Sequence, residues 1–168
     1  MLSDEDMYNR MKKGWRGGRS NCTDCGQGST IKNTRIISEW LPDMCKLLDI
    51  QSVCDAGAGD LHWIKHLKWD VDFKAFDLIP RHHNVEKLDI TREALPKCDA
   101  IICRMVLNHL DDERIKMALE LFRGSAKYLF ATQFVQGGAQ RTREFTRLDL
   151  TKYLGEPIEM CTDGHEDN

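Results

Sequence analysis

The chain has 168 residues, with 24 Lys or Arg and 27 Asp or Glu, so its formal net charge is −3. Hydrophobic residues make up 41% and charged residues 30%, a balance typical of soluble globular domains. No run approaches the roughly 18 apolar residues of a membrane span, and the first ten residues do not resemble a signal peptide. These features exclude collagen, coiled-coil, disordered and membrane proteins. They predict a single cytoplasmic domain over residues 1–168.

The N-terminal residues 1–33 are predicted to form a basic, glycine-rich lid. Residues 14–30 are rich in Gly, Ser, Thr and Asn, which is typical of a loop. Basic residues surround Trp15 over residues 10–19, and such a stretch can bind phosphates and stack on a base. The whole chain is acidic, however, which is unlike a general nucleic-acid-binding protein. We therefore favour a lid, with nucleic-acid binding as the alternative.

Residues 34–50 are predicted to form a helical lead-in. Apolar residues recur there at helical spacing, and Asn33 or Thr34 is a candidate N-cap. Pro42 lies inside this pattern, so we expect a kink or two short helices that meet at the proline.

From residue 51 onward, predicted strands alternate with helices. We expect strands at 52–56, 73–76, 85–90, 100–103 and 127–134, and helices at 60–67 and 111–122. Asp111 or Asp112 is the expected cap of the second helix. This alternation predicts right-handed crossovers and a mainly parallel sheet with helices on both faces. The expected fold class is α/β and Rossmann-like, with a cofactor-binding core over residues 51–135.

The most informative segment, residues 53–67, reads VCDAGAGDLHWIKHL. An apolar strand leads through Asp55 and Ala56 into a turn that contains Gly57 and Gly59. The two glycines permit a tight turn and a close approach of the backbone to a ligand. In open α/β sheets such a turn lies at the carboxyl ends of the strands, where cofactors bind.

The acidic residues near this turn favour a cationic ligand. A dinucleotide fingerprint has a third glycine where this chain has His62, which argues against a nicotinamide cofactor. Asp55 would repel a pyrophosphate but suits an amine or sulfonium. Asp77 ends the next strand, where a carboxylate can accept hydrogen bonds from both ribose hydroxyls. Asp89 is a candidate acceptor for an adenine amino group, with Ile90 packing against the ring.

This arrangement resembles the class I S-adenosylmethionine-dependent methyltransferases. Their first motif corresponds to DAGAGD at residues 55–60, and their acidic second motif corresponds to Asp77. LPKCDAIICRMVLNHL at residues 95–110 resembles their fourth-strand motif. The resemblance implies S-adenosylmethionine as cofactor, bound in addition by Trp63, Leu78, Arg104, Met105 and Val106. Through GGRS, GSTIKNTR and FTRLDLT, the whole chain is similar to short single-domain methyltransferases of bacteriophage genomes.

The resemblance also concerns the two ends of the chain. In the family the N-terminal segment helps to close the site, which implies that Trp15 and Arg19 contact the cofactor or substrate. The family's sheet normally has two further strands after the fifth. Residues 157–161 are the candidate for one of them, within a C-terminal, substrate-side segment at 136–168. A shortened sheet would leave an exposed edge, so we expect a monomer or a homodimer.

Methyl transfer from a sulfonium is an in-line displacement, so the protein has to align the nucleophile and exclude water. His109, just past the fourth strand, is the candidate catalytic base, and packing at the start of the next helix is the alternative. Gln133, at the end of the fifth strand, is a candidate for orienting the substrate. It would otherwise be a solvated strand end.

The sequence leaves the methyl acceptor open. CRMVLNHL, at the end of the fourth strand, lacks the Pro-Pro-aromatic motif of nucleic-acid amino-methyltransferases. Cys103 lacks the preceding proline of cytosine C5 enzymes. We therefore expect a small molecule or a nucleotide as acceptor. The alternatives are a nucleic-acid methyltransferase and a non-catalytic protein that binds S-adenosylmethionine.

Cys22 and Cys25 form a C-x-x-C motif without the second pair of ligands that a zinc site needs. The other cysteines are isolated, and Cys54 and Cys103 lie in predicted buried strands. Without a secretory signal, we expect free thiols. We also expect no bound metal.

Overall fold

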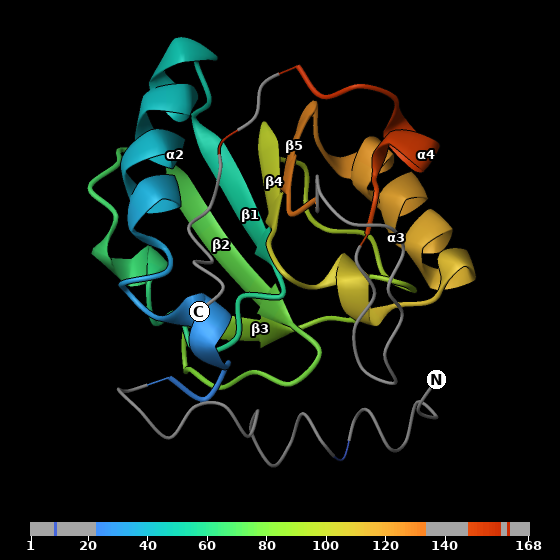
Figure 1. The fold of residues 1–168 in the computed structure, drawn as a ribbon, viewed down its shortest axis with the longest axis horizontal. Coiled ribbons are helices and arrows are strands. Elements are labelled where there is room, and N and C mark those ends of the chain that lie inside the picture. Colours follow the sequence, from blue (N-terminus) through green and yellow to red (C-terminus); the bar gives the residue numbers. More distant parts are fainter. Residues whose placement is uncertain (1–8, 10–22, 134–147, 159–160, 162–168) are drawn as a thin grey trace.

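A computed structural model describes residues 9, 23–133, 148–158 and 161 of the chain. Within these residues, five strands form one sheet in the order β3-β2-β1-β4-β5, and every pair of neighbours is parallel. Helices cover both faces of the sheet (Figure 1). The predicted α/β, Rossmann-like fold with a mainly parallel sheet is confirmed.

The elements of the described residues are short and closely spaced. The strands are β1 (Ser52–Ala56), β2 (Asp72–Asp77), β3 (Val85–Lys87), β4 (Ala100–Cys103) and β5 (Tyr128–Ala131). The α-helices are α2 (Arg35–Leu47), α3 (Asp112–Ser125) and α4 (Thr151–Leu154). The 3-10 turns are η1 (Gln27–Ser29), η2 (Ile64–His66) and η3 (Leu107–His109).

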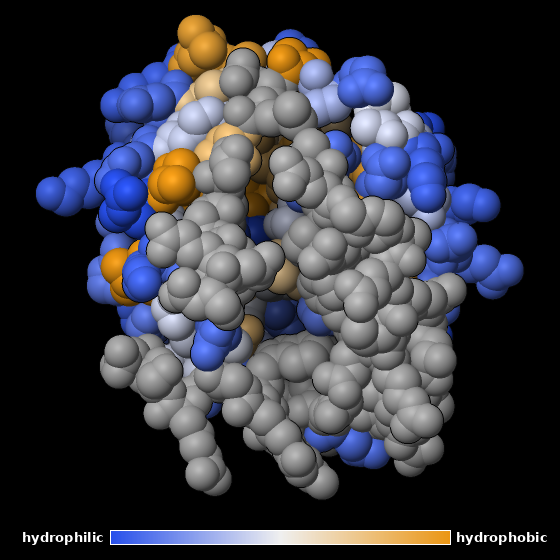
Figure 2. All heavy atoms as spheres, viewed as in Figure 1, coloured by the Kyte–Doolittle hydropathy of each residue, from blue (hydrophilic) through white to orange (hydrophobic). Residues whose placement is uncertain are grey.

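The central strands β1 and β4 send alternate side chains into two separate cores. Val53, Ala100 and Ile102 pack toward α2 and η2 on one face. Cys54 and Ile101 pack toward α3 on the other face. This alternation is the two-residue period of a strand, and helices on both faces bury both sets. The outer surfaces of α2 and α3 carry mostly hydrophilic side chains (Figure 2).

Helix α2 is one helix of 13 residues with Pro42 inside it. The expectation of two short helices is therefore wrong. Pro42 has no N–H group to donate within the helix, but Leu41 and Pro42 are both buried, so packing against the sheet offsets the lost bond. Thr34 occupies the N-cap position without a capping bond, because its hydroxyl donates instead to the Thr30 carbonyl at 2.9 Å.

Residues 60–67 do not form the predicted helix, and the described structure has only η2 there. Gly59 and Leu61 both have positive φ, at 58° and 57°, which interrupts a right-handed helix. The Asp60 carboxylate accepts the amide of His62 at 3.1 Å, a bond that favours a turn. The apolar spacing of this segment therefore reflects burial against the sheet.

The remaining predicted elements are present in the described residues, but the bounds of two strands differ from the prediction. Asp111 caps α3 as predicted, because its side chain accepts the Arg114 amide at 2.9 Å. Strand β3 ends at Lys87, so Asp89 lies in the turn after the strand, not at its end. Strand β5 spans four residues and is shorter than predicted.

The C-terminal residues that the structure describes pack beside α3 (Figure 1). Leu148 and Leu150 belong to the core on that face, and the Tyr153 hydroxyl donates to Asp112 at 3.2 Å. Residues 157–158 form no strand, and residues 159–160 lie outside the described part of the chain. Within the described ranges, no helix is long and apolar enough to cross a bilayer.

Candidate functional site

Three ionisable side chains lie at the carboxyl ends of β2, β1 and β4. Asp55 lies near the end of β1, Asp77 ends β2 and Arg104 directly follows β4. From β1 the chain first builds β2 and β3 on one side and then β4 and β5 on the other. At this reversal of strand order, which we call the crevice, open α/β sheets bind ligands.

The turn after β1 is packed closely between two other segments. The Gly57 amide donates to the Phe76 carbonyl at 2.8 Å, which ties the turn to β2. A Cβ at Gly57, where φ is 101°, would lie 2.2 Å from a methyl carbon of Val106. A Cβ at Gly59 would lie 2.3 Å from the Cys25 Sγ. The two glycines are therefore required by the approach of these protein atoms, whereas the sequence suggested the approach of a ligand.

Asp77 is held by the same turn. Its two carboxylate oxygens accept the amides of Gly59 at 2.9 Å and Ile79 at 2.8 Å. Burial raises the pKa of Asp77, although these two amides and the nearby Arg81 charge act against the rise. A carboxylate oxygen can accept more than one hydrogen bond, so the fixed carboxylate of Asp77 retains acceptor capacity.

Asp55 is a buried carboxyl group with 4% of its surface exposed. Burial, followed by the negative charge of Asp77, raises the pKa of Asp55 to about 8, while Arg104 acts in the opposite direction. At neutral pH the neutral form of Asp55 therefore predominates. A cation placed beside it would favour the ionised form.

The residues after β4 form the other side of the crevice. The Arg104 guanidinium is buried and lies 5.7 Å from the ring centroid of Trp63. Met105 has a φ of 56°, and its amide donates to the Thr132 hydroxyl at 3.0 Å. This bend directs the chain so that Val106 lies against the turn after β1.

His109 lies in η3, close to the buried Asn108. The Asn108 side-chain nitrogen is 3.3 Å from the His109 Nε2. Burial lowers the pKa of His109 to about 4, so the imidazole is neutral at pH 7. A general base works best with a pKa near the operating pH, and His109 is a weaker base than that.

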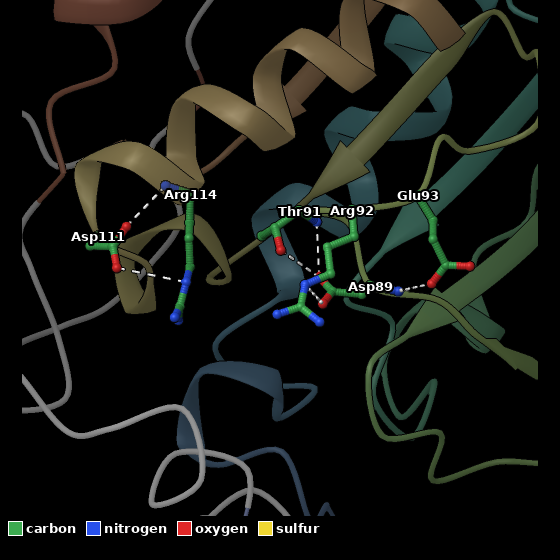
Figure 3. A network of polar contacts seen from close by, with 6 residues as sticks. All are labelled: Asp89, Thr91, Arg92, Glu93, Asp111 and Arg114. Carbon is green, nitrogen blue, oxygen red and sulfur yellow. Dashed lines mark hydrogen bonds and ion pairs between the residues drawn. The ribbon is translucent and has the colours of Figure 1, made fainter.

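In the turn after β3, the carboxylate of Asp89 is bound by neighbouring residues of the protein (Figure 3). One Asp89 carboxylate oxygen accepts the Thr91 amide at 2.9 Å and the Thr91 hydroxyl at 2.7 Å. The other oxygen lies 3.5 Å from Arg92, and the Asp89 amide donates to Glu93 at 3.1 Å. Ile90 is 8% exposed and packs in the core on the α3 face. An adenine contact by Asp89 and Ile90 stays a prediction.

The remaining predicted site residues are Gln133, Leu78, Trp15 and Arg19. Gln133 is not a solvated strand end, because its side-chain oxygen accepts the Leu150 amide at 3.2 Å. Leu78 is half-buried directly after β2. Trp15 and Arg19 lie outside the described residues.

The contacts of Asp60 are not evident from the sequence. This residue directly follows the turn, and its carboxylate accepts the Asp24 amide at 2.9 Å. The C-x-x-C motif lies in the contacting segment, but it indicates only a metal site and no contact with Asp60. Cys22 lies outside the described part of the chain, and the described residues include no cluster of three or more His, Cys, Asp or Glu side chains able to hold a metal ion.

No protein-family model matches this chain, and no curated protein matches it either. Its fold is similar to the methyltransferase domain of bacterial CtHen1-C, with a TM-score of 0.55, 15% identity and coverage of 73% of this chain and 81% of that one. The N-terminal domain of EvdMO1, solved in the presence of SAH and D-fucose, has a TM-score of 0.51 and 11% identity, with coverage of 87% and 72%.

The N-methyltransferase NodS from Bradyrhizobium japonicum WM9, in complex with S-adenosyl-L-homocysteine, has a TM-score of 0.50 and 13% identity. That match covers 73% of this chain and 66% of NodS. These similarities establish a fold shared with solved methyltransferases.

Proposed function

We propose that the protein is an S-adenosylmethionine-dependent methyltransferase that acts on a small molecule or a nucleotide. The observation that carries this proposal is the pair of buried carboxyl groups, Asp55 and Asp77, on adjacent strands at the glycine turn. The fold shared with solved methyltransferases supports the proposal.

The ribose would be held by Asp77. Its carboxylate is oriented by the amides of Gly59 and Ile79, and its remaining lone pairs can accept two hydroxyl groups. Two neighbouring hydroxyls on one carboxylate are the arrangement that a ribose presents. Ala56, Gly57 and Leu78 flank this carboxylate in the proposed site.

The cationic part of the cofactor would lie toward Asp55. This carboxyl group is buried and mostly neutral, and a positive charge beside it would draw it into the ionised form. A pyrophosphate would instead keep Asp55 neutral and would gain no favourable charge from it, which argues against a nicotinamide dinucleotide. When bound, S-adenosylmethionine supplies an electrophilic methyl group on a sulfonium.

The acceptor would enter beside the residues that follow β4. In this proposal Arg104, Met105 and Val106 shape the wall between cofactor and acceptor, and burial near Trp63 helps to exclude water. His109 is available as an unprotonated imidazole, and we assign any proton removal from the acceptor to it.

The cofactor assignment is tested by Asp77→Ala. We expect the Kd for S-adenosylhomocysteine to rise about 10- to 100-fold, because hydrogen bonds to a charged group contribute about 1.5–3 kcal/mol. Calorimetric titration measures this change. Asp70→Ala, which removes an exposed carboxylate, is the control and should bind like the wild type. An unchanged affinity in Asp77→Ala would place the ribose elsewhere.

The enzyme assignment is tested by methyl transfer from a labelled donor. Transfer of the labelled methyl group to a small molecule or a nucleotide would support the proposal. Product only on a nucleic acid, with binding that weakens steeply as salt rises, would indicate a nucleic-acid methyltransferase recruited through its basic residues. Saturable cofactor binding without any product would indicate a binding protein.

A further inference from the structure

Residues 23–25 are fastened to the chain directly after the glycine turn. Asp60 Oδ2 accepts the Asp24 amide at 2.9 Å, across 36 residues of sequence. Thr23 is 3% exposed, and its hydroxyl oxygen accepts the Cys25 amide at 3.0 Å. A segment that precedes the whole sheet is thus attached to the turn that follows its first strand.

Several donors converge on this carboxylate. Burial raises the pKa of Asp60, but hydrogen bonds from the Thr23 hydroxyl, the amides of Asp24 and His62, and the Cys25 thiol bring it below its ordinary value. Burial and the Asp60 charge raise the pKa of Cys25 to about 12, so this thiol stays protonated and able to donate. Asp60 therefore remains ionised at neutral pH and can accept from all of these groups.

The contact continues from Asp60 into the candidate cofactor site. Cys25 Sγ lies where a side chain on Gly59 would be, so the segment presses directly on the turn. The Gly59 amide in turn donates to Asp77 at 2.9 Å, and the Gly59 carbonyl accepts the Arg81 amide at 3.3 Å. An unbroken series of contacts thus leads from Cys25 through Gly59 to Asp77.

We infer that Asp60 is a positioning residue: by binding residues 23–25 it holds Gly59 in place and so fixes the carboxylate of Asp77. This inference rests on the proposed function, in which Asp77 binds the cofactor. Cofactor affinity would then depend on a segment outside the sheet, and Asp60 itself would not need to touch the cofactor.

The variant Asp60→Asn removes the attachment of residues 23–25 but keeps the hydrogen bond that shapes the turn itself. An asparagine oxygen can still accept the His62 amide, but the side-chain nitrogen would then face the Asp24 amide, donor against donor. The matched control is Asp70→Asn, an identical change at an exposed position. Cys25→Ala is a second variant, which removes the thiol from Gly59 and leaves the turn residues unchanged.

Two measurements on the full chain test the inference. Without ligand, we expect the amides of Asp24 and Gly59 to exchange with solvent at least about tenfold faster in Asp60→Asn than in the wild type, as measured by NMR. With S-adenosylhomocysteine, we expect the calorimetric Kd to rise about tenfold in Asp60→Asn, and in the same direction in Cys25→Ala, because a smaller fraction of molecules is competent to bind.

The outcomes are distinguishable. If the amides of Asp24 and Gly59 exchange at the wild-type rate in Asp60→Asn, Asp60 does not attach residues 23–25 to the turn. If these amides exchange faster in Asp60→Asn but the Kd for S-adenosylhomocysteine is unchanged, Asp60 is not a positioning residue for the cofactor site. If the wild type binds no S-adenosylhomocysteine, the proposed function fails and the role in cofactor binding fails with it, while the exchange rates still decide whether Asp60 holds Gly59.

Discussion

The turns after β1 and β4 lie against each other at the carboxyl end of the sheet. Burial shifts the pKa values of two groups beside these turns, Asp55 in β1 and His109 in η3, in opposite directions. It raises the pKa of Asp55 to about 8 and lowers the pKa of His109 to about 4. The cause is the same, because a buried group loses the hydration of its charged form. This end of the sheet therefore keeps both an acid and a base uncharged at neutral pH.

The two turns also differ in how they are built. Backbone amides of the first turn donate to the Phe76 carbonyl and to the Asp77 carboxylate. The second turn relies on a positive φ at Met105 and on the hydroxyl of Thr132, a residue that follows β5. The first turn can thus be recognised from a short motif, whereas the second depends on a distant part of the chain.

The largest expected effect is on the pH dependence of stability through Asp55. Its pKa is about 8 in the folded state against an ordinary value of 3.8, so the folded state binds more protons between these values. The free energy of unfolding therefore falls as pH rises from about 4 to about 8, by roughly 6 kcal/mol at most. Urea unfolding of wild type and Asp55→Asn across this range should show a stability difference that changes with pH. A constant difference would contradict the raised pKa.

The contact between the two turns is tested by Gly57→Ala. The new methyl group would meet Val106, and an alanine at a φ of 101° is strained. We expect a loss of about 4 kcal/mol in the free energy of unfolding, from overpacking and backbone strain together. Gly57→Ala combined with Val106→Ala should recover about half of the loss, with Val106→Ala alone as the reference. No recovery would mean that Val106 does not cause the clash.

A smaller effect of opposite sign is expected from His109. Its pKa falls from 6.5 to about 4 on folding, so the unfolded state binds more protons between these values. Stability is then lost as pH falls from about 6.5 to about 4, by roughly 3 kcal/mol at most. His109→Gln should remove this acid-side loss in thermal or urea unfolding. If wild type and variant lose stability in parallel, His109 is not desolvated as described.

Much of the fold follows from local patterns. The four-residue apolar run of β4 and the capping carboxylate of Asp111 were both predicted correctly. The segment 60–67 was predicted wrongly, because its apolar spacing suits a helix while Leu61 adopts a positive φ that sequence does not reveal. A periodic pattern reports which side chains are buried, and the backbone conformation depends on the neighbouring contacts as well.

Part of the candidate site could also be predicted from local sequence patterns. Asp55 and Asp77 stand next to recognisable strand ends, so their meeting follows from a parallel sheet. The attachment of Asp60 to residues 23–25 was not predictable, because it joins positions 36 residues apart through a single carboxylate. Gln133 likewise binds Leu150 through a contact that no local pattern indicates.

In the proposed function, the carboxyl ends of β1 and β2 bind a methyl donor. The most direct measurement is calorimetric titration of the full chain with S-adenosylmethionine and S-adenosylhomocysteine, with NAD as the control. We expect micromolar binding of the first two ligands and none of NAD, because the Asp77 carboxylate suits a ribose and the buried Asp55 favours a cation over a pyrophosphate. Binding of NAD alone, or of none of the three ligands, would contradict the proposed function.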